Sequence, residues 1–136
     1  MIAAVDSSGL SSVEFITLDG WRKIFGRLSN DKDEFHWSDF NGGKLVGLYG
    51  NINPKGYLNS IGYYVANKGV SYGSGIGNNY NWKDDSVGDL VKITGWTGDF
   101  LNGIQLHFSD GKSTPFIGVN EGSYFEINFD QNDPLK

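Results

Sequence analysis

Apolar and other side chains alternate along three stretches of the chain, SSVEFITLDG, SIGYYVANKG and NGIQLHFSDG, which end at Gly20, Gly69 and Gly111. Alternation with a period of two places apolar side chains on one face of a β-strand, and a glycine directly afterwards favours a turn. The pattern therefore predicts three strands, each with one buried face. The positions expected to share one core are Val13, Ile61 and Ile104, followed two residues later by Phe15, Tyr63 and Leu106.

These strands belong to a unit that occurs three times. The segments IAAV, KLVGL and DLVKI place Ile2, Leu45 and Leu90 at the starts of the units, 43 and then 45 residues apart. A short strand is expected after each glycine turn, in RKIFG, VSYG and TPFIG. Apolar pairs recur at the unit ends, 45 residues apart: Phe35 and Trp37, Tyr80 and Trp82, and Phe125 and Ile127. We therefore expect four strands per unit and twelve in all, as in other repeat folds.

The repeats divide the chain into residues 1–43, 44–87 and 88–133, with a short polar tail at 134–136. A chain of this length is sufficient for one buried core, so we expect a single domain over residues 1–136.

Composition supports an all-β fold and argues against several classes of binding partner. The chain has 20 Gly, 4 Trp, 7 Tyr and 9 Phe, and glycines suit turns while aromatic residues suit a pleated, half-buried surface. A net charge of −5 argues against nucleic acid, which is bound by clustered Lys and Arg. No apolar run approaches the length of a membrane span. The chain has no Cys, which rules out disulfides and thiolate metal sites.

Two all-β folds with threefold repeats of this length compete, the β-trefoil and the β-prism. The chain has neither the Gln-x-Trp triplet of trefoil lectins nor the Gln-x-Asp-x-Asn-x-Val-x-Tyr signature of the monocot-type prism. The third unit, LVKITGWTGDFLNGIQLHFSDGKSTPFIG, resembles the jacalin-related lectins, and KLVGLYGNINPKGYLNSIGYYVANKG repeats its pattern with two extra loop residues. The resemblance implies the β-prism I fold, with three four-stranded antiparallel sheets in pseudo-threefold symmetry.

The resemblance also implies where sugars bind. In that family the Asp that closes the loop before the alternating strand accepts hydrogen bonds from sugar hydroxyls, and backbone amides of a Gly-rich loop in the same unit complete a shallow site. The first unit has a shorter loop with Ser11 at the acceptor position, so no site is expected there. The implied carbohydrate-binding residues are Gly98, Asp99, Phe100 and Asn102 facing Gly118 and Gly122 in the third unit, and Gly56, Tyr57 and Asn59 facing Gly73 and Gly75 in the second.

Asn59 and Asn102 stand where the family has Asp. An ionised carboxylate forms charge-assisted bonds to two hydroxyls, whereas an amide offers one acceptor oxygen, so weaker binding is expected. A structural interpretation stays open, in which Gly95 and Gly98 allow positive φ in a tight connection and Asn102 bonds nearby backbone groups. The alternative acceptors near unit boundaries are Asp6, Asp84, Asp85 and Asp89.

The other candidate metal-binding and catalytic residues are expected to have ordinary surface roles. His36 and His107 alternate with apolar neighbours on strands, so both are expected at the surface rather than as metal ligands. The cluster SNDKDE lacks the Gly and closing Glu of a calcium loop and is interpreted as a solvated loop. The acids in NWKDDSVGD lie in a turn-like stretch that does not suggest a hydrolase cleft. No catalytic residue, metal or cofactor is predicted. Among the Trp residues, Trp37 and Trp82 are expected in the core and Trp21 and Trp96 at the surface.

The leading hypothesis is a non-enzymatic lectin that binds glycans or glycoproteins. The resemblance favours mannose or glucose type sugars, because galactose preference in the family goes with a cleaved chain and a free N-terminal Gly. It also implies an extracellular, secreted module of a larger bacterial adhesin or cytolysin, which attaches that protein to a glycosylated surface or biofilm and meets membranes only through glycans. Each site should bind a single sugar weakly. The overall affinity is therefore expected to depend on pairing of the units or attachment to a larger protein, which raises the effective concentration. The rival hypothesis is a structural or protein-contact module whose Asn loops do not bind sugar.

Overall fold

The computed structural model describes residues 1–6, 9–26, 34–37, 44–65, 68–73 and 78–135; for 5, 6, 9, 34–37, 68–73 and 78 it describes the backbone alone. This part of the chain holds twelve β-strands and no helix, so no helix long and apolar enough to cross a membrane occurs in it. The all-β prediction is confirmed.

The strands follow the three units in order. The first unit holds β1 (Ile2–Asp6), β2 (Gly9–Ile16), β3 (Arg22–Gly26) and β4 (Glu34–Trp37). The second holds β5 (Leu45–Ile52), β6 (Leu58–Val65), β7 (Lys68–Gly73) and β8 (Asn78–Lys83). The third holds β9 (Leu90–Thr97), β10 (Leu101–Phe108), β11 (Ile117–Gly118) and β12 (Ser123–Asn128).

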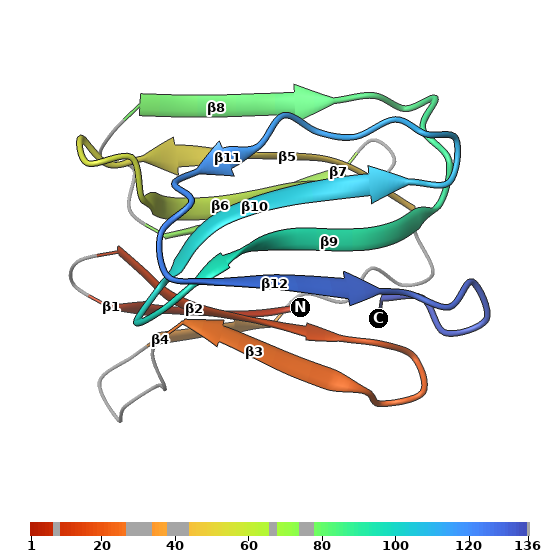
Figure 1. The fold of residues 1–136 in the computed structure, drawn as a ribbon, viewed down its shortest axis with the longest axis horizontal. Helices are drawn as coiled ribbons and strands as arrows, with labels where there is room; N and C mark the ends of the chain where they lie inside the picture. Colours follow the sequence, from red (N-terminus) through yellow and green to blue (C-terminus); the bar gives the residue numbers. More distant parts are fainter. Residues whose placement is uncertain (7–8, 27–33, 38–43, 66–67, 74–77, 136) are drawn as a thin grey trace.

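Each unit forms one sheet, and the strand order within the sheet repeats. The orders are β3-β2-β1-β4, β7-β6-β5-β8 and β11-β10-β9-β12, with antiparallel neighbours throughout. The first two strands of every unit therefore lie at the centre of its sheet. In Figure 1 the sheet of the second unit lies at the top, that of the third across the middle and that of the first at the bottom.

The core lies where the inner faces of the three sheets meet. The central strands β2, β6 and β10 contact one another there, and Val13, Ile61 and Ile104 each have 0% of their surface exposed. Phe15, Tyr63 and Leu106, two residues further along, are buried as well. The predicted core positions are confirmed, because alternation along a strand sends every second side chain to the same face.

The first sheet departs from the repeat by one residue. In the second and third sheets, the residues that pair with Ile61 and Ile104 are Gly50 and Gly95, and their partners on the other side are Tyr80 and Phe125. The corresponding residue of the first sheet, Ala3, pairs with Val13 on one side and with His36 rather than Phe35 on the other. The predictions for the side chains of His36 and Trp37 fall outside the described residues.

The remaining Trp predictions are mixed. Trp82 packs against the core and stacks on Phe108, with ring centroids 6.0 Å apart. Trp21 is exposed, as expected. Trp96 was expected in an exposed loop, but it lies within β9, half-buried. The strand extends to Thr97 because Trp96 pairs with Gly103 on one side and Tyr124 on the other.

The C-terminal residues, expected to form a polar tail, return to the first unit. Leu135 is buried in the core and pairs with Thr17. The Asp133 carboxylate accepts hydrogen bonds from Thr17 Oγ1 at 2.6 Å and from the backbone N–H of Asp19 at 2.7 Å. This segment therefore joins the third unit to the β2–β3 turn of the first.

The shared core predicts a large difference between two isoleucines. We expect Ile104→Ala, at the meeting point of the sheets, to lower the free energy of unfolding by about 2–5 kcal/mol, because it leaves a cavity. Ile24→Ala, on the exposed side of β3, should lower it by less than about 1 kcal/mol. Urea denaturation of both variants measures the difference, and equal losses would contradict the placement of the core.

Candidate functional site

Three loops gather at one end of the molecule, at the left in Figure 1: those after β5, β9 and β11. Between the first two of these loops lies a pocket of about 450 Å³, a size within the range of small-molecule sites. The residues that line it are Leu10, Asn53, Lys55, Tyr57, Leu58, Asn59, Asp99, Phe100 and Asn102. The pocket thus combines the second and third units, with one residue from the first.

The β5–β6 loop is shaped by Asn53. Its side-chain oxygen accepts hydrogen bonds from the backbone N–H groups of Lys55 and Tyr57, both at 3.0 Å. An Asn before a Pro commonly starts a turn in this way. Gly56 completes the turn with φ of 90°, a value that favours glycine. The turn holds Tyr57 and Lys55 at the rim of the pocket.

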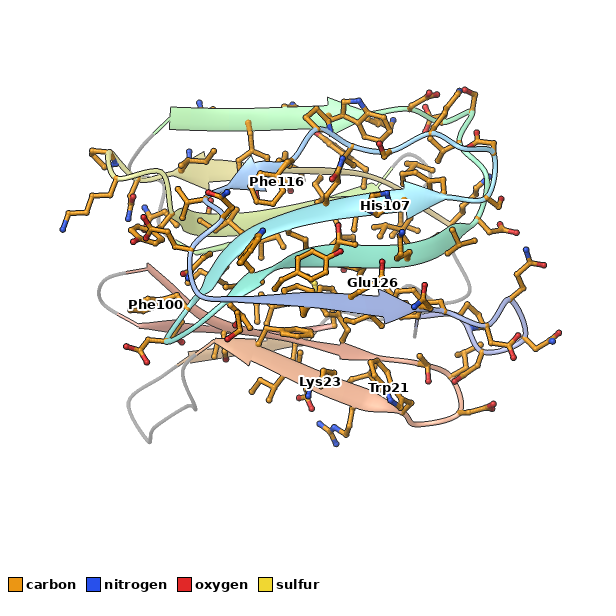
Figure 2. All side chains as sticks on the ribbon, viewed as in Figure 1. Trp21, Lys23, Phe100, His107, Phe116 and Glu126 are labelled. Carbon is orange, nitrogen blue, oxygen red and sulfur yellow. The ribbon has the colours of Figure 1, made fainter. Side chains whose placement is uncertain are left out.

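The β9–β10 loop presents two exposed side chains. The backbone N–H of Gly98 donates to the carbonyl of Phe100 at 3.0 Å, and the hydroxyl of Thr97 donates to the same carbonyl at 3.3 Å. This tight turn leaves Asp99 and Phe100 exposed beside the pocket. In Figure 2, Phe100 lies at the same end of the molecule as the loop.

The positive φ values expected at Gly95 and Gly98 occur elsewhere in the described chain. Gly118 and Gly122, at the two ends of the β11–β12 loop, have φ of 106° and 97°. Gly95 is required for close packing instead, because a Cβ there would lie 2.2 Å from the carbonyl oxygen of Gly103. The backbone N–H of Val119 donates to the Asn102 carbonyl at 2.9 Å.

Asn102 holds the β11–β12 loop in place. Its side-chain Nδ2 donates to the backbone carbonyl of Glu121 at 2.8 Å, and only 7% of its surface is exposed. A carboxylate at this position would have no proton to donate to that carbonyl. The structure thus gives a physical reason for Asn in place of Asp here. Asn59, the matching residue of the second unit, is also buried at the pocket wall.

The loops of the two units are bound to each other. Tyr57 Oη donates a hydrogen bond to the Glu121 carboxylate, while Glu121 accepts at its backbone from Asn102. A Cβ at Gly56 would lie 2.7 Å from Val119 Cγ1, so the loop backbones also lie close together. The hydrogen bond to Glu121 is the main cause that raises the pKa of Tyr57 above its usual value.

The structure brings five of the expected site residues together, in one pocket rather than two. Tyr57 and Asn59 of the second unit line it beside Asp99, Phe100 and Asn102 of the third. Gly98 lies in the exposed turn of the β9–β10 loop, and Gly118 and Gly122 frame the loop behind Asn102. Gly73 is paired with Ser60 at the end of β7. Gly75 falls outside the described residues.

Five contributors were not predicted: Asn53, Lys55, Glu121, Leu10 and Leu58. The Asn53-Pro54 dipeptide is a turn signal that could have identified the first. Leu10 shows that the first unit, for which no site was expected, still supplies one wall, although Ser11 beside it is buried with its hydroxyl bonded to the Ala4 carbonyl. Glu121 has no distinguishing pattern in the sequence.

Of the other acidic candidates, Asp84 and Asp85 are held by partners and neither lines this pocket; Asp85 forms an ion pair with Lys83 at 3.2 Å. The side chain of Asp6 falls outside the described residues. Asp84 accepts hydrogen bonds from the Ser86 hydroxyl at 2.5 Å and from Lys112 Nζ at 2.9 Å, which lower the pKa of Asp84 to about 2. A glycosidase acid requires a raised pKa, so Asp84 has the opposite property. In the described ranges no three His, Cys, Asp or Glu side chains are grouped to hold a metal. Most of SNDKDE, residues 29–33, falls outside those ranges.

The Tyr57 bond predicts a change at alkaline pH. Because the folded pKa of Tyr57 is raised, the contribution of this bond to stability is complete below the unfolded value near 10 and is lost as pH rises through the folded pKa. We expect Glu121→Ala to return the Tyr57 pKa towards its usual value in an NMR titration. Glu126→Ala, which removes the surface partner of Lys92, is the matched control. An unchanged Tyr57 pKa in Glu121→Ala would contradict the hydrogen bond between Tyr57 and Glu121.

Comparisons with known proteins bear on the fold. No protein-family model matches the chain, and a search of the curated proteins gave no match either. Among solved structures, the chain is similar to the crystal structure of a prostate-specific WGA16 glycoprotein lectin, form II, with a TM-score of 0.61. The two chains are 18% identical, and the match covers 76% of each. At this identity the likeness concerns the fold alone: the chain has a lectin-like, all-β fold.

Proposed function

We propose that the protein is a carbohydrate-binding module of the jacalin-related, β-prism I kind, which binds neutral glycans at the pocket between its second and third units. Three sheets with one strand order support the prism, as does the similarity to a lectin structure. The observation that carries the proposal is the convergence of side chains from two units on one pocket.

The pocket has the chemistry that a sugar requires. Hydroxyl groups need paired donors and acceptors, and the apolar C–H face of a pyranose needs a flat apolar surface. Asp99 supplies a carboxylate, Lys55 an ammonium group and Asn59 an amide, while Phe100 supplies an exposed ring. In this proposal Asp99, rather than the buried Asn102, is the main hydrogen-bond acceptor.

The finer features of the proposal rest on the resemblance in sequence. Mannose or glucose type sugars are the first candidates, and binding to a single sugar is weak because the pocket is partly open to solvent. The module acts outside the cell, where it attaches a larger protein to a glycosylated surface, and several weak contacts add through effective concentration. The module carries out no chemical reaction of its own.

One observation favours the rival function, a structural or protein-contact module. Asn102, at the position that binds sugar in the family, uses its Nδ2 to hold Glu121. Tyr57 likewise uses its hydroxyl within the protein. In the rival function, the hydrogen bonds to Glu121 serve only to hold the loops of the second and third units rigid. The exposed Phe100 then contacts another protein.

A glycan array separates the two functions. We expect the unmutated protein to bind mannose- or glucose-terminated glycans, and Asp99→Ala to weaken that binding about tenfold or more, since a hydrogen bond to a charged group is worth about 1.5–3 kcal/mol. Asp99 is exposed, so its removal should leave the fold intact. Asp130→Ala, an exposed acid of the β12–C-terminal turn, is the matched control.

The double variant Asn59→Ala, Asn102→Ala should abolish binding, because it removes two of the three amide side chains that line the pocket. Its fold is checked by its unfolding transition. Binding that survives in both the double variant and Asp99→Ala would place the sugar elsewhere, and an array blank for the unmutated protein would favour the structural module.

A further inference from the structure

A second cavity, called the hollow below, lies on the exposed face of the third sheet. It is separate from the pocket at the loop end of the molecule, which is called the end pocket below. The hollow has a volume of about 470 Å³ and is lined by Trp96, Gln105, Phe116, Gly118, Val119 and Asn120. The inner face of this sheet carries buried Ile93, Ile104 and Leu106, so the alternating residues point to the opposite side. Figure 2 shows Phe116, His107 and Glu126 on the sheet face turned towards the viewer.

Two paired glycines lie at the hollow, and one of them, Gly118, lines it. Gly103 of β10 pairs with Gly118 of β11 on one side and with Trp96 of β9 on the other. A Cβ at Gly103 would lie 2.4 Å from the Phe116 ring, so that ring rests directly on the glycine backbone. The glycine at position 103 is therefore needed to place the Phe116 ring beside the hollow.

Aromatic rings form its walls. The rings of Trp96 and Tyr124 are in an edge-to-face arrangement, with centroids 5.5 Å apart and an angle of 66° between their planes. This contact fixes the orientation of the Trp96 ring beside the hollow. Phe116 and Tyr124 remain 42% and 57% exposed. Aromatic surface left exposed on a sheet face is a typical feature of a binding site.

The rim of the hollow is polar but uncharged. The side chain of Gln105 makes two hydrogen bonds in the described structure. Both are donated by its Nε2, to the Thr114 carbonyl at 2.8 Å and to the Ser113 hydroxyl at 3.5 Å. Its Oε1 therefore keeps its capacity to accept. Asn120, on the opposite side, is exposed and offers a donor and an acceptor. No residue that lines the hollow is ionisable.

The charges on this face are satisfied further along the strands. Lys92 and Glu126 form an ion pair at 3.2 Å. His107 Nε2 is hydrogen-bonded to Thr94 Oγ1 at 2.8 Å, and burial lowers the pKa of this imidazole. A charged ligand would therefore find no unpaired charge of opposite sign among these three groups. The hollow is suited to a neutral ligand.

We propose that this hollow is a second carbohydrate site, in which a neutral pyranose lies against Trp96 and Phe116 and forms hydrogen bonds with Gln105 and Asn120. A pyranose has an apolar C–H face that packs on aromatic rings and a rim of hydroxyls that bond amides. The aromatic walls, amide rim and absence of charge match both features. The proposal goes beyond the end pocket and holds even where that pocket binds nothing.

The two sites lie on either side of one loop. Gly118, Val119 and Asn120 line the hollow on the sheet face, whereas Glu121 of the same loop is bonded to Asn102 and Tyr57 at the end pocket. An oligosaccharide is therefore expected to bind more tightly than a single sugar, because neighbouring residues of one glycan can occupy both sides of the loop.

NMR titration of the whole chain with α-linked mannotriose tests the proposal. The indole N–H of Trp96 reports on the hollow, and the backbone amide of Asp99 reports on the end pocket. We expect the Trp96 signal to shift in a saturable way. Trp96→Ala and Phe116→Ala should each weaken binding to the hollow roughly fivefold to tenfold, measured on a remaining reporter, the Asn120 amide.

Trp21→Ala is the matched control, because Trp21 is also an exposed Trp in an edge-to-face contact, with Phe129 at 6.5 Å. It should leave binding unchanged. Trp96→Phe, which keeps an aromatic ring, should restore part of the affinity and so separates stacking from a loss of folding.

The outcomes distinguish the two sites. A shift at Asp99 with none at Trp96 overturns the second site and leaves the end pocket supported. A shift at Trp96 with none at Asp99 supports the second site and contradicts the end pocket. A Trp96 signal that moves with protein concentration in the absence of sugar assigns the face to contact between two copies of the chain, and overturns the proposal.

Discussion

The structure depends on one constraint: each sheet has one face of closely packed aliphatic and aromatic side chains and can bury this face only against the other two sheets. Val13, Ile61 and Ile104, one from each unit, meet where these faces join and are fully buried. They stand on β2, β6 and β10, and the loops that lead into the last two of these strands emerge together at one end of the core. The candidate pocket lies among those loops because of the way the core is built.

That arrangement also explains why the pocket belongs to two units rather than one. Asn102 and Tyr57, from different units, are both hydrogen-bonded to Glu121, one to its backbone and the other to its carboxylate. An Asp at position 102 would lose the first of these bonds, since a carboxylate has no proton to donate. The amide keeps the loops joined, and the role of sugar acceptor moves to exposed groups such as Asp99.

The sequence was sufficient to predict the strands, their repeat and the core, because alternation along a strand is a local property that fixes which side chains are buried. It was not sufficient for the site. The pocket depends on how the β5–β6 loop packs beside the β9–β10 and β11–β12 loops of the third unit, and no pattern within any one of these loops contains that information. The glycines show the same limit: the structural interpretation gave Gly95 a positive φ, yet Gly95 serves close packing, while Gly118 and Gly122 adopt positive φ. A sequence alone does not distinguish these two reasons for a glycine.

The central claim is that loops of the second and third units form one carbohydrate pocket. A crystal structure of the protein with bound α-linked mannotriose tests it most directly. The account predicts density for a sugar ring in contact with both Tyr57 and Asp99, one from each unit. Density in contact with the loop of only one unit, or an empty pocket at saturating sugar, would contradict it.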